Sequence, residues 1–339
     1  MPTILLSHAE ESRANYYGPR ALAALQSLAE VRLNETGAPL PTEALIEAAC
    51  GCEIILSDRM TPGEAQLFDN APDLVVFLRC AVDVRTVDIP AASRNGVLVA
   101  NAAPGFIDSV SELVFGLMID LARGITGYAT AYRQERPQTI AMGGQLAGGT
   151  LGILGYGNIG ARVAALGQAF GMTVLVNDPY KTIEAPGIVQ VEMDDLLTRS
   201  DHVVCLVVAN DATENLLDAA AFAHMKPGAF FINVSRGNLV DEAALEAALV
   251  SGGIAGAAMD VGRAPDQMPS PGLAKLPNVI ATPHIGGLTP QAIEAQALGT
   301  VAQVEALLSG RLPERALNAP QAHRLTRLGI APPVAETAS

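Results

Sequence analysis

The run from Leu151 to Gly160 constrains the fold more than any other stretch of the chain. It reads LGILGYGNIG, so an apolar segment of strand-like composition passes directly into the pattern G-x-G-x-x-G. Residues 161–170 then have helical composition, and a second apolar run, Met172 to Val176, ends in Asn177-Asp178. A strand, a glycine-rich turn, a helix and a second strand ending in a carboxylate are typical of a dinucleotide-binding βαβ unit.

Each position of this pattern has a physical task in holding a dinucleotide. Gly155 permits a tight turn, Gly157 lets the backbone approach a pyrophosphate, and Gly160 lets the helix pack close to the strand. The helix N-terminus faces the phosphates. Asp178 can accept hydrogen bonds from both ribose hydroxyls and would repel the 2′-phosphate of NADP, although Lys181 adds a nearby cation. We therefore predict NAD as the cofactor, held by Gly155, Tyr156, Gly157, Asn158, Ile159, Gly160 and Asp178.

Composition sets the class of protein. At 339 residues the chain suits two domains, and with 50% apolar and 17% charged residues it can build a large core. A net charge of −14 argues against nucleic acid or an anionic membrane as a partner. The N-terminus resembles a first strand rather than a signal peptide, and no apolar run reaches transmembrane length, so we expect a soluble cytoplasmic protein.

The four cysteines give no sign of a metal site. Cys50 and Cys52 are two residues apart, and no other cysteine or histidine pair has the spacing of zinc ligands. We interpret Cys50, Cys52, Cys80 and Cys205 as buried free thiols, which suit a reducing compartment.

Strand-like and helix-like segments alternate along most of the chain. Up to about residue 100 this alternation predicts a small flavodoxin-like α/β domain with five parallel strands. Ser109-Val110-Ser111-Glu112 has the pattern of a capping box and should open a long helix. A second α/β unit begins at Thr150, residues 262–277 form a proline-rich loop, and residues 290–308 are helical. The strands expected after the first two of this unit are residues 203–208, 229–234, 254–259 and 279–282.

Three polar residues follow separate strands of this second unit. Arg236, Asp260 and His284 each come where a predicted strand ends, and ligands of such folds bind outside the carboxyl ends of the strands. An arginine can clamp a carboxylate through its planar fork, and a histidine can pass a proton near neutral pH. Either residue alone is more simply explained by a local salt bridge. Together, beside a cofactor site, they indicate hydride transfer to or from a carbonyl.

The chain also resembles a known family, the D-2-hydroxyacid dehydrogenases, in the group of phosphoglycerate dehydrogenase, glycerate dehydrogenase and glyoxylate/hydroxypyruvate reductase. The resemblance covers about residues 50 to 318. It rests on six segments in order: 109–112, 155–160, 225–228, 233–242, 256–261 and 283–287.

The resemblance implies a fold, a reaction and a set of site residues. The expected fold is α/β with two doubly wound domains, a Rossmann NAD-binding domain at 102–289 inserted in a flavodoxin-like substrate domain at 1–101 and 290–318, with a C-terminal tail at 319–339. Arg236 is expected to bind the carboxylate of a 2-keto or 2-hydroxy acid, and His284 to be the acid/base. The nicotinamide end of NAD is expected to contact Val234, Ser235, Arg236, Asp260, His284 and Gly287.

Two departures from the family pattern affect the site. The family usually has a glutamate five residues after the aspartate at 260, and here position 265 is Pro. Asp266 is the only carboxylate between Asp260 and His284, so we predict that its carboxylate orients the histidine. The family's substrate loop is commonly Gly-Val-Gly-x-Asp-Asn, and residues 81–86 read AVDVRT. We expect substrate contacts from Ala81, Val82, Asp83, Arg85 and Arg236.

The leading hypothesis is therefore an NAD-dependent dehydrogenase that interconverts a 2-keto acid and a D-2-hydroxy acid, acting as a homodimer on a small molecule and without a metal. A formate or phosphite dehydrogenase would use the same fold. A dinucleotide-sensing scaffold of this fold, with little turnover, is the alternative from a different functional class.

Overall fold

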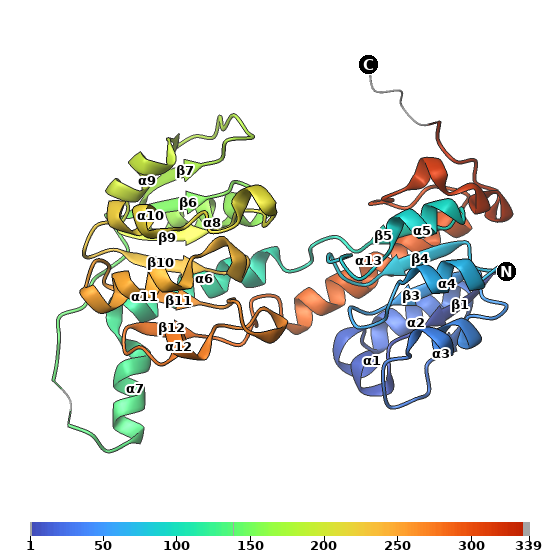
Figure 1. Cartoon of the computed structure of the whole chain (residues 1–339), viewed down its shortest axis with the longest axis horizontal. Coiled ribbons are helices and arrows are strands. Elements are labelled where there is room, and N and C mark those ends of the chain that lie inside the picture. Colours follow the sequence, from blue (N-terminus) through green and yellow to red (C-terminus); the bar gives the residue numbers. More distant parts are fainter. Residues whose placement is uncertain (1, 138, 335–339) are drawn as a thin grey trace. The chain divides into compact units, whose positions relative to one another are not determined.

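A computed structural model describes residues 2–137 and 139–334. The chain divides into two compact units, one built from Met1–Phe106 with Pro290–Ser339 and the other from Ile107–Thr289. Both units are layered α/β structures whose sheets are parallel throughout (Figure 1).

The first unit contains a five-stranded sheet in the order β2-β1-β3-β4-β5. This is the flavodoxin-like order of a doubly wound sheet, so the predicted fold of this unit is confirmed. All four residues of β3, β4 and β5 are buried, as expected for strands covered on both faces. The strands are β1 (Thr3–Leu6), β2 (Glu30–Leu33), β3 (Ile54–Ser57), β4 (Val76–Arg79) and β5 (Leu98–Asn101).

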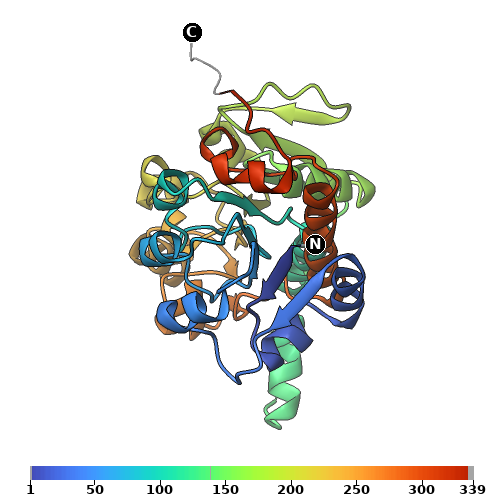
Figure 2. The same cartoon turned by 90° about the vertical axis from the view of Figure 1, so that its right-hand side faces the viewer.

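Two apolar clusters cover the faces of this sheet. Ile4 and Leu56 point into a cluster with α2 and α13, whereas Leu5 and Ile55 point into a cluster with α3, α4 and α5. This alternation along each strand is the expected period of two. Figure 2 shows the dark blue α2 and the orange-red α13 on one side of the sheet and the lighter blue helices on the other. The helices are α1 (Glu10–Tyr16), α2 (Pro19–Leu28), α3 (Thr42–Ala48), α4 (Ala65–Asn70), α5 (Ile89–Arg94) and α13 (Pro290–Leu308).

The C-terminal segment corrects the prediction of a tail. Its 3₁₀ turns η4 (Ala319–Gln321) and η5 (His323–Leu328) place Ala322, Leu325 and Ile330 in the core of the first unit. Asn318 anchors the segment, because its side-chain oxygen accepts from the Val99 N–H at 2.8 Å. Short 3₁₀ turns have no long hydrophobic period, so no periodic pattern predicted them. The segment is rich in proline and alanine, and we therefore predicted a tail.

The second unit contains a seven-stranded sheet in the order β12-β11-β10-β9-β6-β7-β8. The strand order reverses beside β6, as in the Rossmann fold, which confirms the predicted class. The short strand β8 was not predicted from the sequence. The strands are β6 (Thr150–Leu154), β7 (Thr173–Asn177), β8 (Ile188–Gln190), β9 (His202–Cys205), β10 (Phe230–Asn233), β11 (Gly256–Met259) and β12 (Val279–Ala281).

The helices of the second unit differ from the prediction at two places. α6 begins at Ile107, so Ser109 lies inside the helix, where its hydroxyl oxygen is 2.7 Å from Thr289 Oγ1, and is not the expected cap. The proline-rich loop contains the short helices η3 (Pro265–Gln267) and α12 (Pro271–Ala274). The other helices are α6 (Ile107–Arg123), α7 (Ile125–Arg133), α8 (Asn158–Ala169), α9 (Met193–Arg199), η1 (Asp211–Thr213), α10 (Ala219–His224), η2 (Gly237–Leu239) and α11 (Glu242–Ser251).

Three of the four cysteines, Cys52, Cys80 and Cys205, are buried free thiols as predicted. Cys50 is also a free thiol, but it is exposed. Among the helices that the structure describes, none combines the length and the apolar character required to cross a membrane.

Candidate active site

The glycine-rich turn after β6 has the geometry that a dinucleotide needs. Gly155 has φ 92°, and a Cβ there would lie 2.7 Å from the carbonyl oxygen of Leu206. A Cβ at Gly160 would lie 2.3 Å from the Gly155 carbonyl oxygen, so the start of α8 packs directly on the turn. At Gly157, by contrast, a Cβ would meet no heavy atom within 4 Å. The turn therefore leaves open space at the N-terminus of α8, where a pyrophosphate can approach the backbone.

Asp178 stands where the ribose of such a ligand is expected, directly after β7. Its Oδ2 accepts from the Tyr156 N–H at 2.8 Å and its Oδ1 from the Tyr180 N–H at 3.0 Å. Lys181 Nζ donates to the Tyr156 carbonyl oxygen at 2.8 Å. Each carboxylate oxygen can accept a further hydrogen bond, and Asp178 borders a cavity of about 580 Å³. The turn and this carboxylate together fit NAD.

The turn after β10 carries Arg236 and is shaped by a buried amide. Asn233 is fully buried, its Oδ1 accepts from the Ser235 N–H at 3.0 Å, and its Nδ2 donates to the Arg236 carbonyl at 2.9 Å. Ser235 Oγ donates to the Val207 carbonyl at 2.7 Å, and Arg236 Nη1 donates to the Ser235 carbonyl at 2.7 Å. Asn233 is therefore a positioning residue that the sequence analysis missed, although a polar residue ending an apolar strand was the signal.

The buried carboxylate of Asp260 organises the loop that carries His284. Asp260 is 2% exposed. Its Oδ1 accepts from Thr282 Oγ1 at 2.6 Å and from the Ile285 N–H at 2.9 Å, and its Oδ2 accepts from the Gly286 N–H at 2.8 Å. These donors flank position 284 on both sides. Asp260 consequently fixes the backbone on which the histidine sits.

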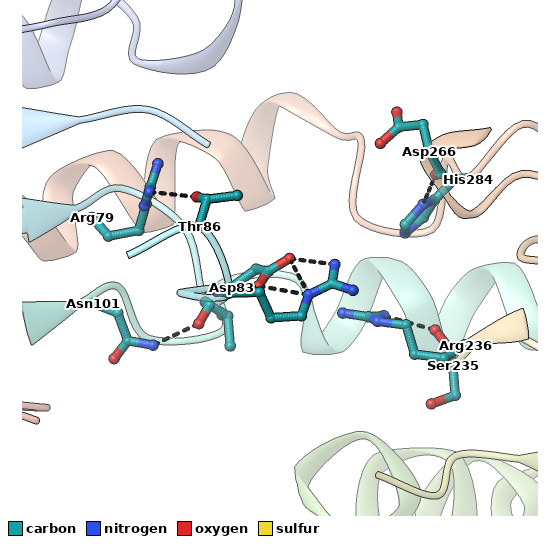
Figure 3. Close-up of polar contacts among 10 residues, drawn as sticks. Arg79, Asp83, Thr86, Asn101, Ser235, Arg236, Asp266 and His284 are labelled. Atoms are coloured by element: carbon teal, nitrogen blue, oxygen red, sulfur yellow. Dashed lines mark hydrogen bonds and ion pairs between the residues drawn. The ribbon is translucent and has the colours of Figure 1, made fainter. Parts of the chain in front are cut away.

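His284 contacts Asp266 through the main chain. The imidazole Nδ1 lies 3.2 Å from the Asp266 carbonyl oxygen, and Figure 3 shows the Asp266 carboxylate turned away from the ring. A carbonyl oxygen only accepts, so Nδ1 carries the hydrogen, and the neutral ring presents Nε2 as its acceptor. Asp266 and Gln267 have φ of 57° and 61°. This left-handed turn, which sequence reasoning did not foresee, directs the carbonyl and not the side chain toward the ring.

In the first unit, residues 81–86 follow the end of β4 and lead toward α5. Asp83 and Arg85 form an ion pair with an Nη2–Oδ2 distance of 2.6 Å. This hydrogen bond raises the pKa of Arg85. Asn101 Nδ2 donates to the Val82 carbonyl at 2.6 Å and Arg79 Nη2 donates to Thr86 Oγ1 at 2.9 Å, so both ends of the segment are tied to strand ends.

The candidate residues of the second unit thus gather along one edge of its sheet. The glycine-rich turn, Asp178, Arg236, Asp260 and His284 follow β6, β7, β10, β11 and β12, and parallel strands place their carboxyl ends at the same edge. Val234 and Gly287 belong to the same segments. Within residues 2–137 and 139–334, no group of His, Cys, Asp or Glu side chains is arranged to hold a metal ion.

Comparison with known families agrees with this geometry. Residues 115–286, about half of the chain, match the model of the D-isomer specific 2-hydroxyacid dehydrogenase, NAD binding domain. The chain belongs to this family. The match confirms the resemblance inferred from the sequence and identifies NAD as the cofactor of the second unit.

Similar proteins extend the comparison to most of the chain. A hydroxypyruvate reductase from Thermotoga maritima is 31% identical over 263 residues, covering 77% of this chain and 86% of the relative. A D-3-phosphoglycerate dehydrogenase from Methanocaldococcus jannaschii is 34% identical over 302 residues, covering 88% of this chain but 57% of the relative. The chain thus spans little more than half the length of the phosphoglycerate dehydrogenases it matches. The solved TT0316 protein from Thermus thermophilus is 29% identical with a TM-score of 0.81, covering 93% of this chain and 99% of that structure.

Proposed function

We propose that the protein is an NAD-dependent oxidoreductase that interconverts a 2-keto acid and a D-2-hydroxy acid. The observation that carries the proposal is the setting of His284. Asp260 holds its loop, a main-chain carbonyl fixes the hydrogen on Nδ1, and the ring lies at the same sheet edge as the NAD-binding turn. A ring fixed in this way presents Nε2 for proton transfer.

The reaction assigns one task to each charged residue. When bound, NADH would supply the hydride for C2 of the keto acid, and NAD⁺ would accept a hydride in the reverse direction. His284 gives a proton from Nε2 to the carbonyl oxygen during reduction and takes it from the hydroxyl during oxidation. Arg236 binds the substrate carboxylate through its guanidinium fork and holds C2 in place.

Further contacts are assigned on the same basis. We propose that NAD is bound by Gly155, Tyr156, Gly157, Asn158, Ile159, Gly160, Asp178, Val234, Ser235, Arg236, Asp260, His284 and Gly287. We propose that the acid is bound by Arg236 and by Ala81, Val82, Asp83 and Arg85. Asp266 orients His284, with its main-chain carbonyl in the role that the sequence assigned to its carboxylate.

A dinucleotide-sensing scaffold is the second candidate. It is favoured by the contact between His284 and a neutral carbonyl, because a carboxylate would stabilise the protonated imidazole more strongly. NADH oxidation measured against a panel of 2-keto acids separates the two functions. The enzyme proposal expects turnover with at least one acid, and NADH binding without any turnover would support the scaffold.

The homodimer and the cytoplasmic location are also proposals. α7 exposes Ile125 and Tyr132, at 50% and 74% of their surfaces, on a helix that projects from the second unit (Figure 1). Apolar side chains on a projecting helix are suited to bury surface against a second copy. Light scattering of the purified chain tests the dimer, and a monomer at micromolar concentration would contradict it.

A further inference from the structure

Within the segment 81–86, the carboxylate of Asp83 pairs with Arg85. The Asp83 carboxylate accepts from the Arg85 backbone N–H at 2.9 Å, from Arg85 Nε at 3.0 Å to each oxygen, and from Arg85 Nη2 at 2.6 Å. A backbone N–H and a guanidinium edge are the donors that proteins use to bind a free carboxylate or phosphate. The Asp83 carboxylate thus occupies the Arg85 donors with which the anionic group of a ligand could otherwise pair.

The surrounding contacts hold this arrangement in place. Asn101 is 3% exposed and binds the Val82 carbonyl, and its own Oδ1 accepts from Arg315 Nε at 3.0 Å. Arg79 is fully buried and donates to Thr86 Oγ1 and to the Asp58 carbonyl oxygen. Burial lowers the pKa of Arg79 to about 10. Because Arg79 is buried and donates to groups of the protein, its side chain is not exposed to a ligand. Arg85 is the accessible cation of the segment, with 66% of its side chain exposed.

The charge of this pair discriminates between kinds of acid. The charges of Arg85 and Asp83 sum to zero, so an uncharged substituent of the substrate meets no net charge at this pair. A phosphate or second carboxylate would have to displace Asp83 from Arg85 or lie beside its negative charge. Both routes cost binding free energy, because unpaired like charges close together at a partly buried site repel strongly.

We propose that Asp83 fills the anion position of this segment, and that the substrate is therefore a 2-keto or 2-hydroxy acid whose only anionic group is its C1 carboxylate. Phosphorylated and dicarboxylic acids are disfavoured. This specificity rests on the proposed function, and it assigns Asp83 and Arg85 as the residues that set it.

Hydroxypyruvate and 3-phosphohydroxypyruvate form a matched pair of probes that differ by one phosphate. We expect the full-length protein with NADH to show a kcat/KM at least about tenfold higher for hydroxypyruvate. Asp83→Asn keeps the shape but removes the charge and releases Arg85, so the ratio should move toward the phosphorylated acid by about tenfold. Asp83→Asn combined with Arg85→Gln should lose that gain, because the gain depends on the released guanidinium.

Asp69→Asn is the control variant, since it removes the same charge from an exposed position on α4 and should leave the ratio unchanged. A wild-type preference for the phosphorylated acid, or an unchanged ratio in Asp83→Asn, would overturn the inference. Affinities of both acids for the protein–NADH complex are measured by calorimetry in parallel. These affinities test the preference for the uncharged substituent even if the protein does not turn over either acid. Binding without any turnover contradicts the proposed function and leaves the charge preference to be decided by the two affinities.

Discussion

The carboxyl edges of the two sheets carry the same three residue types, but the histidine and the arginine are buried at the first edge and only partly buried at the second. In the first unit His8 follows β1, Asp58 follows β3 and Arg79 ends β4. All three are buried, and Arg79 and Asp58 bind the protein itself. In the second unit the corresponding set is Arg236, Asp260 and His284, listed in the order of β10, β11 and β12.

Burial explains the difference. His8 is 1% exposed, its Nδ1 has no hydrogen-bond partner within the described residues, and burial lowers its pKa to about 4. His284 instead sits on a loop fixed by a buried carboxylate, and its side chain is only partly buried. A histidine at a strand end thus becomes a candidate acid/base only when the backbone is rigid and one ring nitrogen is accessible. Residue type and position alone do not distinguish the two edges.

Replacing His284 and His8 in turn should show the difference between the two sheet edges most clearly. His284→Asn should lower kcat for keto-acid reduction by about 10² to 10⁴ with little change in NADH affinity, because it removes the proton donor. His8→Asn should leave kcat within a few-fold and instead lower the free energy of unfolding by about 1–3 kcal/mol. Steady-state kinetics, fluorescence titration of NADH and thermal melts are the measurements. Equal kinetic losses in the two variants would contradict the distinction.

Asp260→Asn tests whether the second edge depends on its buried carboxylate. The amide would place an NH₂ group against at least one of the N–H or O–H donors of the loop, leaving that donor unpaired at a cost of about 1–3 kcal/mol. We expect kcat to fall by about 10- to 100-fold, with the pH profile changed because the histidine moves. A variant with a lower melting temperature but wild-type kcat and profile would make Asp260 merely structural.

Acid should destabilise the protein through its two buried histidines, His8 and His202. Burial lowers the pKa of His8 and of His202 from 6.5 to about 4. Between these values the unfolded chain binds protons that the folded chain does not, so stability falls as the pH drops from about 6.5 toward 4. Each histidine should cost at most about 2 kcal/mol at pH 5. Denaturant titrations at pH 7 and pH 5 measure this loss, and His202→Phe should show a smaller one.

Variants of Asp266 test whether its main-chain carbonyl, and not its carboxylate, orients His284. Asp266→Asn keeps the carbonyl and tolerates a φ of 57°, so kcat and the pH–rate profile should remain close to wild type. Asp266→Val should lower kcat several-fold, because a β-branched residue is strained at that φ and displaces the carbonyl. If Asp266→Asn instead shifted the pH optimum downward, the carboxylate would be the partner, as the sequence suggested.

The sequence was informative where one local pattern determines one structure. The run 151–160 with Asp178 predicted the nucleotide fold, because strand, turn, helix and acid follow each other within one unit. The partner of His284 could not be predicted, since it depends on the left-handed φ of Asp266 and Gln267. The packing of residues 319–330 was missed because short 3₁₀ turns carry no long hydrophobic period. The Asp83–Arg85 pair was visible as two opposite charges, but its geometry was not.

The central claim is that the second edge transfers hydride and does not merely bind a dinucleotide. It is tested most directly with NADH that carries deuterium at the transferable position of C4. The protein is incubated with this NADH and hydroxypyruvate, and the acids are analysed by mass spectrometry and chiral chromatography. We predict a D-2-hydroxy acid with deuterium on C2, formed by the wild type and at least about 100-fold more slowly by His284→Asn. Labelled NADH that binds but leaves hydroxypyruvate and the other 2-keto acids of the panel unreduced and unlabelled would contradict the account.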